Sequence, residues 1–228
     1  MQSSSPGGDA RRVHWEHVWA RSGPSAVSWY QRLPAVSLEL IGELGIPTGA
    51  AVLDVGGGTS GLVDALLARG FTDVTVLDIA AAALRTARER VGASNAAHWL
   101  VADVLAWEPD RGYDLWHDRA VFHFLTDADD RRRYLDILHA ALRPGGAVVL
   151  GTFAADGPTT CSGLPVVRYS PEQLAEALGP ELEVAATRRE EHLTPSGAVQ
   201  PFTWVAARHR GRATAAEAYA AERDSRGT

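Results

Sequence analysis

The sequence predicts an α/β fold, with one mostly parallel sheet of seven strands covered by helices on both faces. Apolar runs alternate with helix-like patterns from residue 51 to residue 178, which is typical of strands joined by helical crossovers. These runs are continuously apolar, as expected for strands that are buried on both faces. The last two runs have no helix between them, so we expect them to pair as an antiparallel hairpin at the edge of the sheet.

The expected elements follow in chain order. We expect strands near 51–55, 74–78, 98–102, 113–117 and 146–153, and then the hairpin strands 181–190 and 201–208. Helices are expected near 60–69, 80–91, 129–142 and 171–178, with two more helical patterns between residues 10 and 48. Residues 10–208 then form a single domain. Residues 1–9 are expected to be disordered, and residues 209–228 to form a tail or a loose helix.

Composition indicates which kinds of partner the protein is expected to bind and where in the cell it is expected to lie. The chain has 228 residues, of which 46% are hydrophobic, and a net charge of −6. It has no basic cluster of the kind that binds phosphates, which disfavours a nucleic-acid partner. No apolar run reaches the length of about 18 residues that a membrane span needs, and the amino terminus lacks a signal-peptide pattern. A single cysteine, Cys161, fits the cytoplasm and predicts neither a disulfide nor a metal site.

Residues 52–61 form the most informative segment, Val-Leu-Asp-Val-Gly-Gly-Gly-Thr-Ser-Gly. A buried strand here leads through a loop with almost no side chains into a helix, so a ligand can lie against the main chain. Gly56, Gly58 and Gly61 fit the pattern G-x-G-x-x-G of dinucleotide sites, although the pattern alone is a weak signal.

Asp78 is a second indication that the ligand is a nucleoside. It ends the next expected strand, about 20 residues after the loop, where a carboxylate can accept hydrogen bonds from ribose hydroxyls. NAD and S-adenosylmethionine both carry such a ribose. These residues therefore leave open an NAD(P)-dependent oxidoreductase, a methyltransferase and a non-catalytic module that binds a nucleoside.

The order of motifs resembles that of the class I S-adenosylmethionine-dependent methyltransferases over residues 50–208, and the closing hairpin is also a feature of that family. The matching segments are 52–58, 76–78, 101–104, 113–119 and the turn at 142–146. Segments 27–31, 117–125 and 161–170 further resemble a bacterial subgroup without an assigned substrate. The resemblance implies a Rossmann-like class I methyltransferase fold, a helical lid at residues 10–48, S-adenosylmethionine as cofactor and S-adenosylhomocysteine as its product.

The resemblance also implies which residues bind the cofactor. Asp78 would accept hydrogen bonds from the ribose and Asp103 from the adenine amine, although Asp103 could instead cap a helix. Asp54 would order the glycine loop or contact the ammonium group through water. The full predicted set is Trp29, Asp54, Gly56, Gly57, Gly58, Asp78, Ile79, Asp103, Val104 and His117.

The acceptor side is predicted from residues 116–119, Trp-His-Asp-Arg, which replace the Asn/Asp-Pro-Pro-Tyr of many amine methyltransferases. We hypothesise that His117 or Asp118 moves a proton or orients the acceptor, and that Arg119 holds an anion or orders the loop. In the alternative, His117 contacts the cofactor and Asp118 pairs with Arg119 structurally. The acceptor is expected to be a small molecule, and a protein lysine is the alternative.

Aromatic residues and Cys161 give weaker expectations. Trp15 and Trp19 are expected to be buried against the sheet, whereas Trp29 and Tyr30, in a connector, are better placed to contact a ligand. His123 is expected to be a packing residue because its neighbours are apolar. Cys161 is expected in a loop that borders the acceptor pocket.

Overall fold

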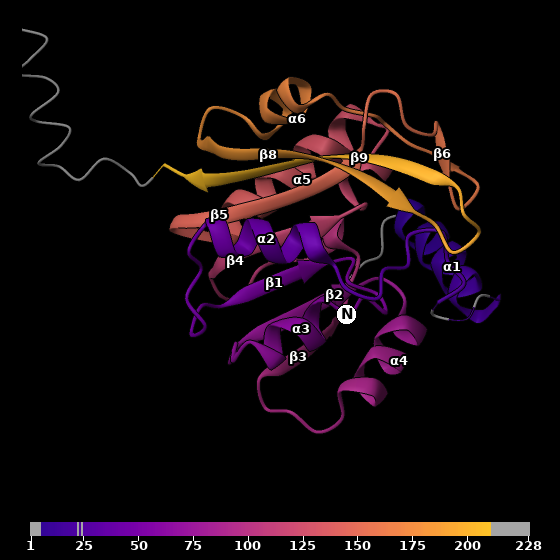
Figure 1. Cartoon of the computed structure of the whole chain (residues 1–228), viewed down its shortest axis with the longest axis horizontal. Helices are drawn as coiled ribbons and strands as arrows, with labels where there is room; N and C mark the ends of the chain where they lie inside the picture. The colour runs from indigo at the N-terminus through magenta and orange to yellow at the C-terminus, as the bar shows by residue number, and fades with distance from the viewer. Residues whose placement is uncertain (1–5, 22, 24, 211–228) are drawn as a thin grey trace, which may run out of the picture.

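The computed structural model describes residues 6–21, 23 and 25–210 and contains one seven-stranded sheet (Figure 1). Its strands are β1 Val52–Val55, β2 Val74–Asp78, β3 Ala97–Val101, β4 Tyr113–Arg119, β5 Leu142–Phe153, β8 Leu182–Leu193 and β9 Val199–His209. Their order is β3-β2-β1-β4-β5-β9-β8. The first five are parallel, and β9 runs antiparallel to both β5 and β8. The predicted α/β sheet and its closing hairpin are confirmed.

Helices cover both faces of this sheet (Figure 1). They are α1 Pro6–Arg21, α2 Ala35–Glu43, α3 Leu62–Ala68, α4 Ala81–Val91, α5 Ala128–Ala141 and α6 Pro171–Leu178, with 3-10 helices η1 Val104–Ala106 and η2 Phe122–Phe124. Apolar side chains of α2, α3 and α4 form one core with the sheet, and those of α5, α6 and η1 form a second core on the other face. Strands β1 and β2 are buried along their whole length, as their apolar sequences require.

Local sequence signals explain where several helices begin. The side chain of Asp127 accepts hydrogen bonds from the first turn of α5. Ser170 and Gln173 form a capping box at the start of α6, which places this helix at the predicted residues 171–178.

Some predicted boundaries were wrong. Helix α1 begins at Pro6, so residues 6–9 are helical and not disordered. Strand β5 begins at Leu142 and includes the Arg-Pro-Gly-Gly segment, for which the sequence predicts a turn. A small hairpin of β6 (Thr160–Cys161) and β7 (Leu164–Pro165) was not predicted. Residues 1–5 and 211–228, to which the expected disorder and tail partly belong, lie outside the described residues.

Helix α1 lies beyond the carboxyl ends of the parallel strands (Figure 1). Glu16 anchors it there, since its carboxylate accepts hydrogen bonds from the Ala81 and Ala82 N–H groups at the start of α4, at 2.7 and 3.4 Å. Acidic side chains are favoured at a helix N-terminus. Among the described residues, no helix is both long and apolar enough to cross a membrane.

Candidate cofactor and acceptor site

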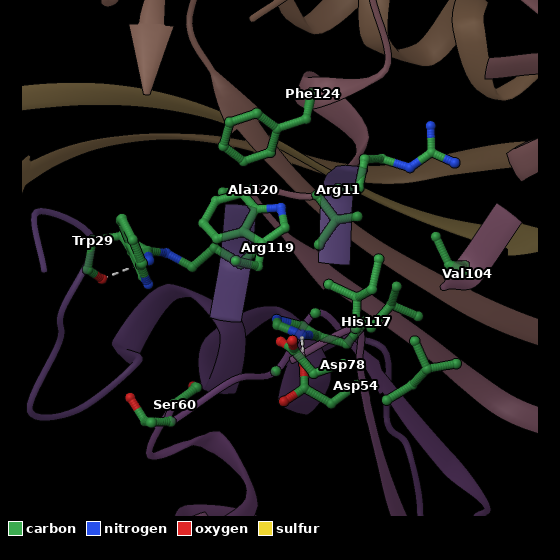
Figure 2. Close-up of a pocket in the computed structure, with 18 of the residues that line it drawn as sticks. Arg11, Trp29, Asp54, Ser60, Asp78, Val104, His117, Arg119, Ala120 and Phe124 are labelled. Atoms are coloured by element: carbon green, nitrogen blue, oxygen red, sulfur yellow. Dashed lines mark hydrogen bonds and ion pairs between the residues drawn. The ribbon is translucent and has the colours of Figure 1, made fainter. Parts of the chain in front are cut away.

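A cavity lies at the carboxyl ends of β1, β2 and β4 and is closed on one side by α1 and the connector at residues 25–31. Every predicted site residue except Gly58 and Asp118 lines it. Figure 2 shows His117, Asp54 and Asp78 gathered in its centre, with Arg119 beside Trp29. Ligands of open parallel sheets bind at this edge.

The glycine loop fits closely against its neighbours. Gly56 has a φ of +64°, and a Cβ added there would lie 2.0 Å from Cγ2 of Val121. A Cβ at Gly57 would lie 2.6 Å from Oδ2 of Asp54. The N–H groups of both glycines donate to the Leu77 carbonyl oxygen, at 2.7 and 3.3 Å, so they tie the loop to β2. Only glycine allows this path, which leaves the main chain open to a ligand.

Asp54 and His117 form the buried centre of the site. They occupy paired positions on β1 and β4, and Nδ1 of His117 lies 2.7 Å from Oδ1 of Asp54. The other ring nitrogen lies 2.9 Å from the hydroxyl oxygen of Ser37 on α2. Both nitrogens therefore have protein partners. Asp54 was expected to order the glycine loop or to contact the ammonium group through water, and its described hydrogen bond goes to His117.

Asp78 ends β2 with its carboxylate facing the cavity. Its Oδ1 accepts a hydrogen bond from the Ala80 N–H group at 2.8 Å. Burial raises the pKa of Asp78 to about 7, because the charged form loses its hydration there. Nearby Asp54 raises it further, while backbone hydrogen bonds from Ala80 and Gly58 lower it.

Asp103 is engaged by the protein in two ways. Its Oδ1 accepts from the Leu105 N–H group at 3.0 Å and so caps η1. Its Oδ2 accepts from the guanidinium of Arg11, with Nη2 at 2.9 Å. The alternative capping role of this residue is thus present, and Arg11 joins α1 to the same carboxylate.

Asp118 faces away from the cavity, because successive side chains of a strand point to opposite faces. Its carboxylate accepts from the N–H groups of Val121 and Phe122, at 2.8 and 3.0 Å, and from the Tyr134 hydroxyl on α5. It shapes the loop after β4 and does not pair with Arg119. The structure therefore separates Asp118 from the acceptor side.

Arg119 projects into the cavity and is held by the connector. Its Nη1 donates to the carbonyl oxygen of Trp29 at 2.8 Å, and its guanidinium stacks on the Phe202 ring at 4.6 Å. Burial lowers the pKa of Arg119 to about 10, because the charged guanidinium is removed from water.

Aromatic rings of α1, the connector and η2 line another part of the cavity. Trp15 packs edge-on against both Trp29 and Phe124, with ring centroids 6.0 and 5.0 Å apart. Trp19 packs against Trp29 at 5.8 Å. The expectation that Trp15 and Trp19 are buried against the sheet was wrong, since both line the cavity together with Trp29 and Tyr30.

Two further expectations concern His123 and Cys161. His123 is fully buried between the rings of Phe124 and Phe153 and lies outside the cavity lining, as a packing residue should. Cys161 does line the cavity, and burial raises the pKa of its thiol to about 11. A neutral thiol of this kind is a poor nucleophile.

Comparison with known proteins identifies the domain around this site. Residues 52–146 match the family described as "Methyltransferase domain". The whole domain has the fold of a solved S-adenosylmethionine-dependent methyltransferase from Anabaena variabilis, which aligns over 92% of this chain with a TM-score of 0.70 and 19% identity. The matched residues contain the glycine loop, all three cavity aspartates and the His117–Arg119 segment.

Three known proteins illustrate what this chain is similar to. An uncharacterised methyltransferase of Mycobacterium tuberculosis is 38% identical over 121 residues, 52% of this chain and 58% of that protein. Malonyl-[acyl-carrier protein] O-methyltransferase 1 of Ilyobacter polytropus is 33% identical over 104 residues, 45% of this chain and 37% of that protein. The chain thus spans only part of the length of these relatives. The solved 1,6-didemethyltoxoflavin-N1-methyltransferase of Burkholderia thailandensis aligns over 92% of each chain, with a TM-score of 0.66 and 22% identity.

Two residues that position the site were not predicted from the sequence. Ser37 is buried in α2 and meets His117 from 80 positions away. The only feature of the sequence that could have indicated Ser37 is that it is a polar residue on the apolar face of a helix. Arg90 of α4 donates to the carbonyl oxygens of Thr59 and Ser60, at 2.8 and 2.7 Å, and so holds the end of the glycine loop. Nothing in its local sequence distinguishes it from a solvated helix arginine.

Proposed function

We propose that this protein is a methyltransferase that transfers a methyl group from S-adenosylmethionine to a small molecule. One observation carries the proposal. A glycine loop and the carboxylates of Asp54, Asp78 and Asp103, which lie near the carboxyl ends of three neighbouring strands, line the same cavity. The toxoflavin methyltransferase of similar fold was solved with S-adenosylhomocysteine bound, which supports this choice of cofactor.

The residues present fit this cofactor. Among the described residues, the buried Oδ2 of Asp54 has no hydrogen-bond partner, and it is suited to accept from the cofactor's ammonium group. Asp78 would accept from the ribose hydroxyls, and Asp103 from the adenine amine. Ile79 and Val104 would provide apolar walls for the base. The bound cofactor supplies a methyl group activated by a positively charged sulfur.

The chain's own residues then position the acceptor beside that methyl group. His117 is held on both ring nitrogens, so we assign it a positioning role and not that of a free base. The rings of Trp15, Trp29 and Phe124 exclude water from the cavity and provide an apolar surface for the acceptor. Alignment of two bound reactants can supply a large part of the rate enhancement of an in-line displacement.

The cover of the cavity favours a small acceptor. Arg11 connects α1 to Asp103, which follows β3, and Glu16 connects α1 to the start of α4. Helix α1 also contributes Trp15 and Trp19 to the lining of the cavity. A cavity enclosed in this way suits a metabolite better than a protein side chain. The named small-molecule substrate of the toxoflavin methyltransferase is consistent with this preference.

Incubation with methyl-labelled S-adenosylmethionine tests the proposal. A metabolite extract and a protein extract are treated in parallel with wild-type protein and with the loop variant Gly57→Ala, in which the added Cβ meets Asp54. We expect label in the metabolite fraction with wild-type protein only. Label confined to the protein fraction would instead show a protein methyltransferase, such as a lysine methyltransferase. Absence of label from both fractions would contradict the proposed activity.

A further inference from the structure

Arg119 carries an unused hydrogen-bonding edge. Its Nη1 is engaged by the Trp29 carbonyl oxygen at 2.8 Å. Its Nε and Nη2 are both buried, and within residues 6–21, 23 and 25–210 neither has a hydrogen-bond partner. Because Arg119 lines the cavity, a ligand in the cavity is the natural partner for these two donors. A buried charged group without partners is costly, so its retention points to a ligand.

The geometry of a guanidinium makes the two free donors specific. Nε–H and one N–H of Nη2 lie side by side on one edge of the planar group, and this edge matches the two oxygens of a carboxylate. The plane itself is held on one side by the Phe202 ring, at 4.6 Å, and at its far end by Trp29. Arg119 is therefore oriented before any ligand binds.

The neighbouring carboxylate of Glu190 does not accept hydrogen bonds from the Nε and Nη2 edge of Arg119. Glu190 is close enough for its charge to raise the pKa of Arg119, yet its oxygens accept from the side chains of Gln31 and Trp204. The distance from Nε1 of Trp204 to Oε2 of Glu190 is 2.8 Å. No ion pair joins Arg119 to a carboxylate in the part of the chain that the structure describes.

The position of Arg119 separates it from the expected nucleoside end. Figure 2 shows Val104 and Arg119 at opposite ends of the drawn cavity, with His117 between them. Arg119 shares its end with Trp29, Phe124 and Cys161, which also line the cavity. Resting on the proposed function, we infer that the methyl acceptor carries a carboxylate group and that Arg119 binds this group through its Nε and Nη2 edge.

Binding of two matched probes tests this inference without knowledge of the natural acceptor. Benzoate and its neutral analogue benzamide are titrated by calorimetry into wild-type protein, with and without saturating S-adenosylhomocysteine. We expect benzoate to bind at least about tenfold more tightly than benzamide, as for other charge-assisted hydrogen bonds. The preference should vanish in Arg119→Gln and persist in Arg132→Gln, a control at an exposed arginine of α5. Equal binding of the probes to wild-type protein, or a preference retained in Arg119→Gln, would overturn the inference.

A second arm separates the acceptor's carboxylate from the one on the cofactor. S-adenosylhomocysteine carries an amino-acid carboxylate, and 5′-methylthioadenosine lacks it. Arg119→Gln should leave the ratio of their affinities unchanged, and a collapse of that ratio would assign Arg119 to the cofactor instead. Failure of wild-type protein to bind S-adenosylhomocysteine would contradict the proposed function, whereas binding without a benzoate preference would contradict only this inference. Because that comparison uses wild-type protein, misfolding of a variant cannot decide it.

Discussion

The Asp54 carboxylate and the His117 imidazole lie 2.7 Å apart across neighbouring strands, and both side chains are at most 3% exposed. The second ring nitrogen, Nε2, lies 2.9 Å from the hydroxyl oxygen of Ser37, so both nitrogens of His117 have protein partners. The chain of contacts fixes β1, β4 and α2 around the point where the cofactor's amino-acid end is expected. We therefore propose that His117 is a positioning residue and not a catalytic one.

Replacement of His117 tests this role. His117→Ala leaves Asp54 buried without its partner, so we expect a loss of about 1–3 kcal/mol in the free energy of unfolding and weaker cofactor binding. Ser37→Ala removes only the outer contact and should cost less. Denaturant unfolding and calorimetry with S-adenosylhomocysteine provide the two readouts. A His117→Ala protein with wild-type stability and affinity would show that the contact has no positioning role.

Cofactor binding should depend on pH through Asp78. Its pKa of about 7 means that the carboxylate is protonated below this pH and ionised above it. Only the ionised form accepts hydrogen bonds from both ribose hydroxyls, so affinity should fall as pH decreases from 8 to 6, by roughly tenfold. Calorimetry with S-adenosylhomocysteine across this range measures the effect. Asp78→Asn should bind weakly with a flat profile, and an unchanged slope in that variant would assign the titration to another group.

The loop after β4 should depend on the contact between Asp118 and Tyr134. Tyr134→Phe removes a buried hydroxyl that donates to Asp118 and accepts from Trp116, and we expect a loss of about 1–2 kcal/mol in the free energy of unfolding. Tyr169→Phe is the matched control, because among the described residues the Tyr169 hydroxyl has no hydrogen-bond partner. Thermal unfolding of both variants measures the effect. An equal loss in the free energy of unfolding in the two variants would argue against a specific role for Asp118.

The glycine loop allows a comparison of two alanine substitutions. At Gly57 a Cβ would lie 2.5 Å from Cγ1 of Val76, so Gly57→Ala should displace the loop and abolish cofactor binding. At Gly61 the nearest atom, the Arg32 carbonyl oxygen, would be 3.6 Å from the Cβ, so Gly61→Ala should bind normally. Affinity for S-adenosylhomocysteine is the readout. Similar affinities in the two variants would contradict the close fit described for Gly57.

Local sequence patterns were sufficient to predict the sheet and the acidic residues near the ends of its strands. Continuous apolar runs identify β1 and β2 as buried strands, and spacing from the glycine loop identifies Asp78. The side chain of Asp118 lies outside the cavity, which was not foreseen because the fourth strand was expected to end at residue 117, whereas β4 continues to Arg119. Within a strand, neighbouring side chains face opposite sides, so Asp118 points away from the face that His117 and Arg119 share.

Contacts between residues far apart in the sequence could not be predicted from local patterns. Ser37 meets His117, and Trp29 meets Arg119, across 80 and 90 positions of sequence. Which way the rings of Trp15 and Trp19 face depends on how α1 docks. That docking is determined by Arg11 and Glu16, whose partners lie on other elements. Periodicity within α1 carries no information about those partners.

The identity of the cofactor is decided by calorimetric titration of the wild-type protein with S-adenosylhomocysteine and, separately, with NAD. We expect saturable one-to-one binding of S-adenosylhomocysteine that is lost in Gly57→Ala and retained in Gly61→Ala, and no saturable binding of NAD. Binding of NAD without binding of S-adenosylhomocysteine would contradict the assignment of this cavity to a methyl donor.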